Sequence, residues 1–266
     1  MAVRDEIASR ERLPQPTRAE RAVADLLPIG ADEETARAAL ESVPLWFHTF
    51  SLDGGAMYTP GVARDHRYRI PVLPQDFSGM SVLDVGTFDG FYAFLAEARG
   101  AERVVAVDNE QYRDWVLARW GVELEGGAGF RTIAELLRSQ VEYQRLDAFD
   151  LDLLHDQFDL VFCFGILHRV EDPLGLLGVL RRRLADGGCV LLETHGVTSP
   201  DLEHEAAVHV WEPGEVYAHD DYVYWGFTGK SLARLAGHAG FGGTEIVDTP
   251  VIDGHPRIIG TLVAEE

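Results

Sequence analysis

The sequence predicts an α/β protein with a Rossmann-like, mostly parallel seven-stranded sheet and helices on both of its faces. From residue 80 onward, short apolar runs alternate with helical segments, a pattern typical of strands that are buried on both sides. A further helix at 229–239 and two final strands, TEIVDTPVI and PRIIGTLVAE, indicate an antiparallel edge to the sheet. The parallel strands are expected at 81–85, 103–107, 141–146, 159–164 and 188–194, and the helices between them at 90–99, 112–120, 129–139 and 173–184.

Two segments lie outside this alternation. Residues 1–75 are predicted to form N-terminal helices and a segment that covers the substrate and cofactor, ahead of a core at 76–266. Within that segment, Thr17 and Glu20 have the spacing of a helix capping box, and the aromatic, Gly-rich stretch LWFHTFSLDGGAMYTPG indicates a folded loop or short hairpin. The second segment, at about 196–228, is rich in His, Asp and Glu and is predicted to be a lid insertion.

Charge and composition narrow the class of partner. The 266 residues include 23 basic and 44 acidic side chains, a net charge of −21, and such a surface repels nucleic acid and anionic lipid. A small-molecule partner is therefore expected, nucleic acid is disfavoured, and a homodimer stays open. With no run of eighteen apolar residues and no apolar signal core, we expect a cytoplasmic protein without a membrane partner. Cys163 and Cys189 have no disulfide or zinc spacing and are expected to be buried thiols.

The first candidate binding residues lie at the turn after strand 81–85. Gly86 and Gly90 would allow a ligand to approach the backbone where a helix begins, with Thr87 between them. Asp84, at the strand end, could accept a hydrogen bond from an amino group of a cofactor, directly or through water. By itself, this Gly-x-x-x-Gly spacing fits an ordinary strand-to-helix turn equally well.

A second acid narrows the predicted ligand to a nucleoside. Asp108 ends strand 103–107, 22 positions after Gly86, and a carboxylate there can bind both ribose hydroxyls of an adenosine. This feature also fits an NAD enzyme. However, a dinucleotide fingerprint has a glycine where Phe88 stands, and the acidic Asp89 disfavours a phosphate at the helix start. The turn therefore favours the ammonium and carboxylate of methionine, as in S-adenosylmethionine (SAM).

Two more signals follow in the same order along the chain. Asp147 follows the third strand, where an acid can bind the amino group of adenine while the neighbouring backbone N–H of Ala148 binds a ring nitrogen. The stretch FDLVFCFGILHRVEDPL predicts a buried strand, an exposed tip and a new helix. Parallel sheets present their ligand-binding groups at this carboxyl edge.

These four stretches, LDVGTFDG, VVAVD, RLDAFD and FDLVFCFGILHRVEDP, resemble motifs I, post-I, II and IV of class I SAM-dependent methyltransferases. The resemblance covers about residues 44–245. More narrowly, WFHTFSLDGGAMYTPG, LPQDFSGMSVLDVGTFDGFYAF and YWGFTGKSLARLAGHAGF are similar to the tRNA wobble-uridine carboxymethyl/methoxy-methyltransferase group and its small-molecule-modifying bacterial relatives. The resemblance implies that the cofactor is contacted by Gly86, Asp108, Asn109, Asp147, Ala148, Phe164 and His168.

The sequence departs from that group in two places. The carboxymethyl enzymes have a lysine in the segment that matches PLWFHTFSL and a tyrosine where His168 stands, and both help to hold the extra carboxylate of carboxy-SAM. This sequence has no Lys or Arg from Pro44 to Gly61, and its single lysine is Lys230. Plain SAM is therefore the expected cofactor.

Histidines are the candidate catalytic residues, because an oxygen or nitrogen acceptor must lose a proton. His168, at the tip after the fourth strand, is expected to be best placed as a general base. His48 in WFHTF could cap the substrate, and His195 also faces the carboxyl edge; for all three, packing or cofactor contact is an alternative role. Glu203-His204-Glu205 could bind a divalent metal, but a solvated loop is the preferred interpretation, and no metal is expected.

The predicted function is transfer of a methyl group from SAM to an oxygen or nitrogen of a small molecule, such as a specialised metabolite. Three alternatives stay open: a tRNA-modifying methyltransferase, a SAM-binding protein without methyl transfer such as a cyclase, and an NAD(P) enzyme. The acceptor is expected to be apolar or aromatic because aromatic residues are abundant around the expected pocket: Trp46, Phe47, Phe50, Tyr58, Tyr222, Tyr224, Trp225 and Phe227.

Overall fold

The computed structural model describes residues 16–63, 66–197, 201–202, 204–217, 220–252 and 254–265. The first fifteen residues of the expected N-terminal segment, and Glu203 of the acidic run considered for a metal, lie outside the described residues. In the described part, none of the helices has the length and apolarity needed to cross a membrane.

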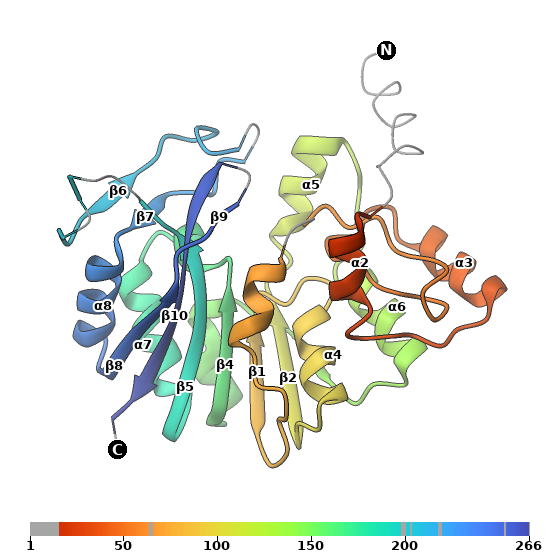
Figure 1. The fold of residues 1–266 in the computed structure, drawn as a ribbon, viewed down its shortest axis with the longest axis horizontal. Coiled ribbons are helices and arrows are strands. Elements are labelled where there is room, and N and C mark those ends of the chain that lie inside the picture. Colours follow the sequence, from red (N-terminus) through yellow and green to blue (C-terminus); the bar gives the residue numbers. More distant parts are fainter. Residues whose placement is uncertain are drawn as a thin grey trace.

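Seven strands form the main sheet, in the order β3-β2-β1-β4-β5-β10-β8, with the short strand β9 paired to β10 (Figure 1). The first five are parallel, and β10 runs antiparallel to both of its neighbours. The expected mostly parallel sheet with an antiparallel edge is confirmed. The strands are β1 (Ser81–Val85), β2 (Arg103–Asp108), β3 (Glu142–Arg145), β4 (Phe158–Phe164), β5 (Leu184–His195), β8 (Phe241–Asp248), β9 (Val251–Ile252) and β10 (His255–Ala264).

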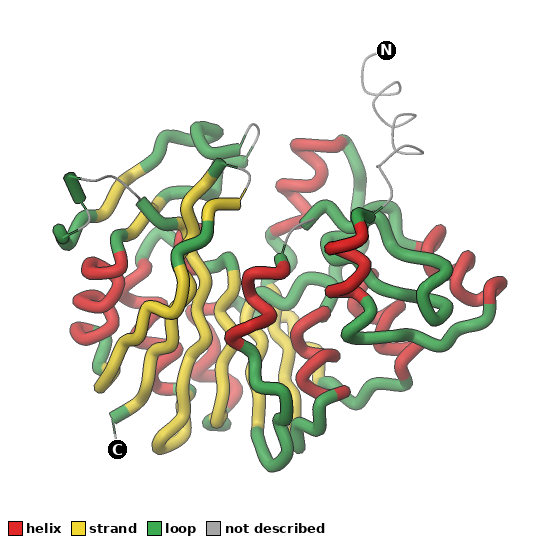
Figure 2. The backbone as a smooth tube through the Cα atoms, viewed as in Figure 1, coloured by secondary structure: helices red, strands yellow, loops and turns green. Residues whose placement is uncertain are grey.

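Helices cover both faces of the sheet, as Figure 2 shows. Alternate residues of each buried strand enter one of two apolar clusters: one contains α4, α6 and the N-terminal segment, the other α7, α8 and η3. The helices are α2 (Arg18–Ala24), α3 (Glu33–Ser42), α4 (Phe91–Ala98), α5 (Tyr112–Trp120), α6 (Ala128–Leu137), α7 (Pro173–Arg182) and α8 (Gly229–His238), with 3₁₀ turns η2 (Arg67–Val72), η3 (Ala148–Leu154) and η4 (Leu167–Arg169).

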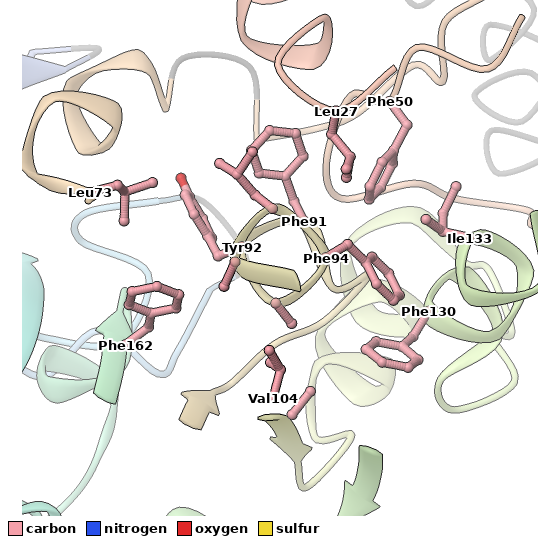
Figure 3. Packing of buried hydrophobic residues seen from close by; sticks show 14 of the residues in the cluster. Leu27, Phe50, Leu73, Phe91, Tyr92, Phe94, Val104, Phe130, Ile133 and Phe162 are labelled. Carbon is pink, nitrogen blue, oxygen red and sulfur yellow. The ribbon is translucent and has the colours of Figure 1, made fainter. Parts of the chain in front are cut away.

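The N-terminal segment packs on the core through helix α4. Phe91 and Phe94 of α4 lie against Phe50 and Leu27 on one side and Phe130 of α6 on the other (Figure 3). The predicted capping box is present, because Thr17 accepts from the Glu20 N–H and Glu20 accepts from the Thr17 N–H. This packing places residues 44–63 directly beside the carboxyl edge of the sheet.

A few element boundaries and one burial prediction differ from the sequence interpretation. The helix expected at 173–184 ends at Arg182, and β5 begins at Leu184 rather than at 188, because Leu184 already pairs with Phe158 of β4. The glycine turn at 186–188 is therefore an irregularity inside the strand rather than the loop before it. Cys163 is buried as expected, but Cys189 is half-buried.

Candidate active site

A cavity of about 420 Å³ opens at the carboxyl ends of β1, β2 and β4. Tyr222 and Tyr224 line it from the segment between residues 196 and 228. In the described part of this segment, β6 (Val208–Val210) and β7 (Trp225–Phe227) pair as a separate small sheet. The structure brings together most of the residues that the sequence assigned to the cofactor: Gly86, Asp108, Asn109, Asp147, Ala148, Phe164 and His168 all line this cavity.

The two glycines of the first turn have different roles. Gly86 lines the cavity with a φ of 76°, and a Cβ atom there would collide with the side chain of Ile166. Gly90, with a φ of 87°, lies outside the cavity lining, and a Cβ atom there would collide with Phe94 and Phe130. Gly90 therefore makes room for the packing of α4 against α6, rather than for the expected close approach of a ligand.

Asp84 and Thr87 lie behind the main cavity. The Thr87 hydroxyl donates to Asp84 Oδ2 at 2.7 Å, and burial raises the pKa of Asp84 to about 7. Both residues face a second cavity of about 20 Å³, which shares Gly86 and Arg69 with the larger one. A space of this size is enough for one water molecule.

Asp108 is fixed by the backbone around it. Its Oδ2 accepts from the Phe88 N–H at 3.0 Å, and its Oδ1 accepts from the Glu110 N–H at 2.6 Å. Burial raises the pKa of Asp108 to about 6. Since a carboxylate oxygen has two lone pairs, each oxygen keeps one for a hydroxyl group in the cavity.

The next strand end along the sheet carries Asp147. Its Oδ1 accepts from the Phe149 N–H at 2.9 Å and its Oδ2 from Asn109 Nδ2 at 2.8 Å. These bonds tie the end of β3 to the end of β2, because Asn109 directly follows Asp108. Ala148 and Phe149 complete this side of the cavity.

Phe88 and Asp89 dock the N-terminal segment on the first turn. The ring of Phe88, whose φ is 51°, stacks between Phe47 and Tyr112 at centroid distances of 4.3 and 3.8 Å. Asp89 Oδ2 accepts from the backbone N–H groups of Phe47 at 2.6 Å and His48 at 3.0 Å. From the sequence, both residues are expected to disfavour a pyrophosphate at this turn. The structure adds a second function, which is to hold one wall of the cavity in place.

Substitutions at Asp89 should therefore separate its hydrogen bonds from its charge. Burial raises the pKa of Asp89 to about 7, against 3.8 in an exposed carboxyl. Its contribution to stability is thus fully present below pH 3.8 and is lost as the pH rises through 7. Both N–H groups bind the same oxygen, which an asparagine can supply. We expect the stability of Asp89→Asn in urea unfolding, relative to the wild type, to rise by about 2–3 kcal/mol between pH 5 and pH 8.

Asp89→Ala removes both hydrogen bonds and should lower the free energy of unfolding by about 2–4 kcal/mol at pH 5. Asp186→Asn, in the exposed glycine turn within β5, is the matched control and should change stability equally little at both pH values. An Asp89→Asn protein whose unfolding curve shifts with pH in parallel with that of the wild type would contradict this assignment.

His168 is buried in the 3₁₀ turn η4 after β4. Its Nδ1 accepts from the backbone N–H of His195 at 3.3 Å and lies 3.3 Å from Thr194 Oγ1, so a neutral ring carries its proton on Nε2. Burial, with neighbouring His195 and Arg169, lowers the pKa of His168 well below 6.5. The neutral Nε2–H is a donor, and this arrangement disfavours the general-base role expected from the sequence.

The other two candidate histidines lie outside the main cavity lining. His48 faces the small cavity, within a cluster of aromatic rings and His66, and burial lowers its pKa well below 6.5. His195 is fully buried beside Trp211 and Tyr217, and burial, with Arg257 and Arg169, lowers its pKa to about 2. The geometry therefore supports neither ring as a base for the acceptor. His195 acts on the site through its backbone, which orients His168.

Sequence reasoning missed a buried ion cluster at the floor of the cavity. Glu193 of β5 accepts from Arg69 Nη2 at 2.6 Å and from Arg257 Nη1 at 3.1 Å, and both arginines line the cavity. Both arginines lie outside the segment from Pro44 to Gly61, in which the carboxymethyl enzymes have their lysine. The available signal was Glu193 itself: an acid within the apolar strand CVLLETH requires a buried cation as its partner.

The 196–228 segment is attached to the tip after β4. The Tyr224 N–H donates to the His168 carbonyl at 2.9 Å, the Trp225 indole donates to the Val170 carbonyl at 2.7 Å, and Arg169 pairs with the buried Asp220. Tyr222 and Tyr224 line the cavity as a result. Two residues of the predicted lid insertion therefore belong to the cavity lining.

Residues 60–246 match the model of the methyltransferase domain family, and the chain belongs to this family. The fold is that of the class I SAM-dependent methyltransferases, and SAM is the cofactor. The residues fit this cofactor because a cavity with acids at the ends of β2 and β3 and a glycine turn at β1 offers acceptors for ribose and adenine.

Two curated relatives are tRNA U34 carboxymethyltransferases. The protein from Campylobacter hominis is 30% identical over 126 residues, which cover 47% of this chain and 40% of the relative. The protein from Sulfurovum sp. is 24% identical over 173 residues, which cover 65% and 51%. The chain thus spans about half the length of the curated relatives it matches.

Solved structures of similar fold include complexes with S-adenosylhomocysteine (SAH). The N-terminal domain of EvdMO1 with SAH and D-fucose has a TM-score of 0.63 at 22% identity, covering 87% of this chain and 96% of that one. A SAM-dependent methyltransferase from Mesorhizobium loti has a TM-score of 0.52 at 18% identity, covering 74% and 96%. These likenesses support the Rossmann-like fold.

Proposed function

We propose that the protein transfers a methyl group from SAM to an oxygen or nitrogen of a small molecule that has an apolar or aromatic part. The observation that carries this proposal is the cavity itself, which continues from the acids at β2 and β3 past His168 to a wall of aromatic side chains. Phe47 and Tyr112 stand on one side and Tyr222 and Tyr224 belong to the opposite segment. Such rings suit a planar or apolar acceptor.

The cofactor is assigned to the side of the cavity nearest β1, β2 and β3. Asp108 would accept from both ribose hydroxyls, while Asp147 and the backbone of Ala148 would bind adenine. Asp84 would reach the methionine ammonium through a water molecule in the small cavity, and Gly86 leaves room for the chain of the ligand. SAM supplies an electrophilic methyl group at its sulfonium.

The protein's part in catalysis is mainly to align the two reactants. Methyl transfer is an in-line displacement, and fixed proximity supplies most of the rate. His168, which lines the cavity as a neutral ring, would donate its Nε2–H to the acceptor and orient its nucleophilic atom. The acceptor proton would leave to solvent at the cavity rim, where Glu171 is exposed.

A tRNA substrate is the second candidate, and the curated relatives favour it. The net charge of −21 opposes it, because a tRNA-binding surface must attract phosphates. Several exposed arginines of the described residues are also already paired with acids, among them Arg37 with Glu33 and Arg131 with Glu125. The cytoplasmic location and a homodimer remain predictions.

SAM with a radiolabelled methyl group tests the proposal against two alternatives: a tRNA methyltransferase, and a SAM-binding protein that catalyses no methyl transfer. The protein would be incubated with a library of phenols, alcohols and amines, and in parallel with total tRNA from a strain that lacks wobble-uridine modification. We expect label in a small-molecule product, with an equal amount of SAH. Label in tRNA would replace the proposal by the second candidate. SAM binding without label transfer or SAH in either pool would indicate a protein that catalyses no methyl transfer.

A further inference from the structure

The floor of the cavity holds two guanidinium groups and one carboxylate. Arg69 and Arg257 each expose about 11% of their side chains, and Glu193 between them exposes none. Arg257 Nη2 also donates to the Tyr217 hydroxyl at 2.8 Å. Among the described residues, the Nε groups of both arginines have no hydrogen-bond partner. Arg69 also has hydrogen bonds with Tyr68 and Tyr92. These partners are neutral, so the positive charge of the two arginines exceeds the single negative charge of Glu193 between them.

Neighbouring charged groups do not remove this excess. Burial alone lowers the pKa of both arginines, yet their neighbours, Glu193 among them, raise the pKa of each above its usual value, so both are cations. Arg169 is matched by Asp220. Asp84 lies near Arg69, but with a pKa of about 7 it is not a full counter-charge at neutral pH. A buried surplus of about one positive charge is unfavourable unless an anion binds there.

The order of strands places the surplus charge on the acceptor side. The acids assigned to the adenosine end β2 and β3, whereas Glu193 and Arg257 lie on β5 and β10, on the other side of β1 and β4. With neighbouring strands about 4.8 Å apart, β10 lies roughly 14 Å from β1 and about 19 Å from β2. Arg257 therefore lies farther from the adenosine than the methionine end of the proposed cofactor site does. It lines the same cavity as His168, Tyr222 and Tyr224.

We propose that the methyl acceptor carries a carboxylate, which Arg257 binds at the floor of the cavity beside Arg69. A single negative charge balances the surplus, and the planar fork of an arginine matches the two oxygens of a carboxylate. This inference builds on the proposed function, because it names a chemical feature of the same acceptor. The aromatic wall and the arginine together select a molecule with an apolar ring at one end and a carboxylate at the other.

Binding measurements with matched ligands test this directly. The protein saturated with SAH would be titrated in a calorimeter with 4-hydroxybenzoate and 3-(4-hydroxyphenyl)propanoate, and then with the uncharged amide of each. The members of each pair differ in charge but hardly in shape. For at least one pair we expect the carboxylate to bind about tenfold or more tightly than the amide, since a hydrogen bond to a charged group is worth at least that factor. Equal affinities, or no binding by any of these ligands, would overturn the proposal.

Variants assign the preference to one residue. Arg257→Gln should bind the carboxylate no better than the amide while keeping its SAH affinity within about twofold, and Arg257→Lys should keep part of the preference because it keeps the charge. Arg182, on α7, forms an exposed ion pair with Asp152 of η3. Arg182→Gln is the matched control and should behave as the wild type. Glu193→Gln frees the guanidinium groups and should strengthen carboxylate binding, which loss of packing would not do.

Titration with carboxy-SAM shows whether the carboxylate that Arg257 binds belongs to the acceptor or to the cofactor. If Arg257→Gln weakens carboxy-SAM or SAH binding instead of the acceptor preference, the arginine serves the cofactor and the proposal fails. Failure of the proposed function looks different: the carboxylate preference would persist in calorimetry, but no methyl group would reach any acceptor.

Discussion

Asp108→Ala should lower the affinity for SAH by about 100-fold. The carboxylate is held by the Phe88 and Glu110 N–H groups, and Asp108 lines the cavity. Two hydrogen bonds from ribose hydroxyls to a charged acceptor account for about 3 kcal/mol, or two powers of ten in affinity. Calorimetric titration with SAH measures the effect, and thermal unfolding followed by circular dichroism shows whether the variant is folded.

The affinity for SAH should also depend on pH through Asp108. The pKa of Asp108 is raised to about 6, and hydroxyl donors favour the ionised carboxyl. SAH affinity should therefore fall as the pH is lowered through 6, and this decline should be absent in Asp108→Ala. Asp186→Ala, at an exposed acid in the glycine turn within β5, should retain both the affinity and its pH dependence. Equal SAH binding by Asp108→Ala and the wild type would remove Asp108 from the cofactor site.

His168→Ala should reduce turnover by about 100-fold while leaving SAH affinity within a few-fold. The side chain lines the cavity beside the tip of β4, and its Nδ1 is engaged by the His195 N–H. The remaining Nε2–H would orient the acceptor, so its loss affects the reaction more than cofactor binding. Turnover is measured as SAH released in the presence of the acceptor found by methyl labelling.

His168→Gln distinguishes a donor from a base. The glutamine amide can place an N–H near the position of Nε2, so a donor role predicts that this variant recovers at least tenfold over His168→Ala. Because the pKa of His168 lies well below 6.5, the wild-type turnover should also show no acidic limb from this residue between pH 6 and 8. An acidic limb near 6.5 that disappears in both variants would restore the general-base role.

Local sequence patterns were enough to predict which residues meet at the carboxyl edge of the sheet, where the cofactor is proposed to bind. Asp108 ends the buried strand β2, and Asp147 follows the largely exposed edge strand β3. Because strands in a parallel sheet end at a common edge, the chain order alone predicts that the two acids lie close together. Gly86 could be predicted for the same reason. The confirmed strands and helices likewise depend on apolar runs that are short and regular.

The acceptor half depends on contacts that no local pattern contains. Glu193 pairs with Arg69, 124 positions away, and with Arg257, 64 positions away. Phe88 and Asp89 looked like parts of a ligand turn, but their partners at Phe47 and His48 come from a segment about 40 residues earlier. The tautomer of His168 depends on a backbone N–H on the neighbouring strand. A side chain's chemistry can be read from a sequence, but its partners depend on how distant segments fold together.

A crystal structure of the protein with SAH tests most directly the claim that cofactor and acceptor occupy opposite halves of one cavity. We expect both ribose hydroxyls on Asp108, adenine beside Asp147, and the sulfur directed toward the space between His168 and Arg257. A ribose bound away from Asp108, or a methionine carboxylate seated on Arg257, would contradict this division of the site.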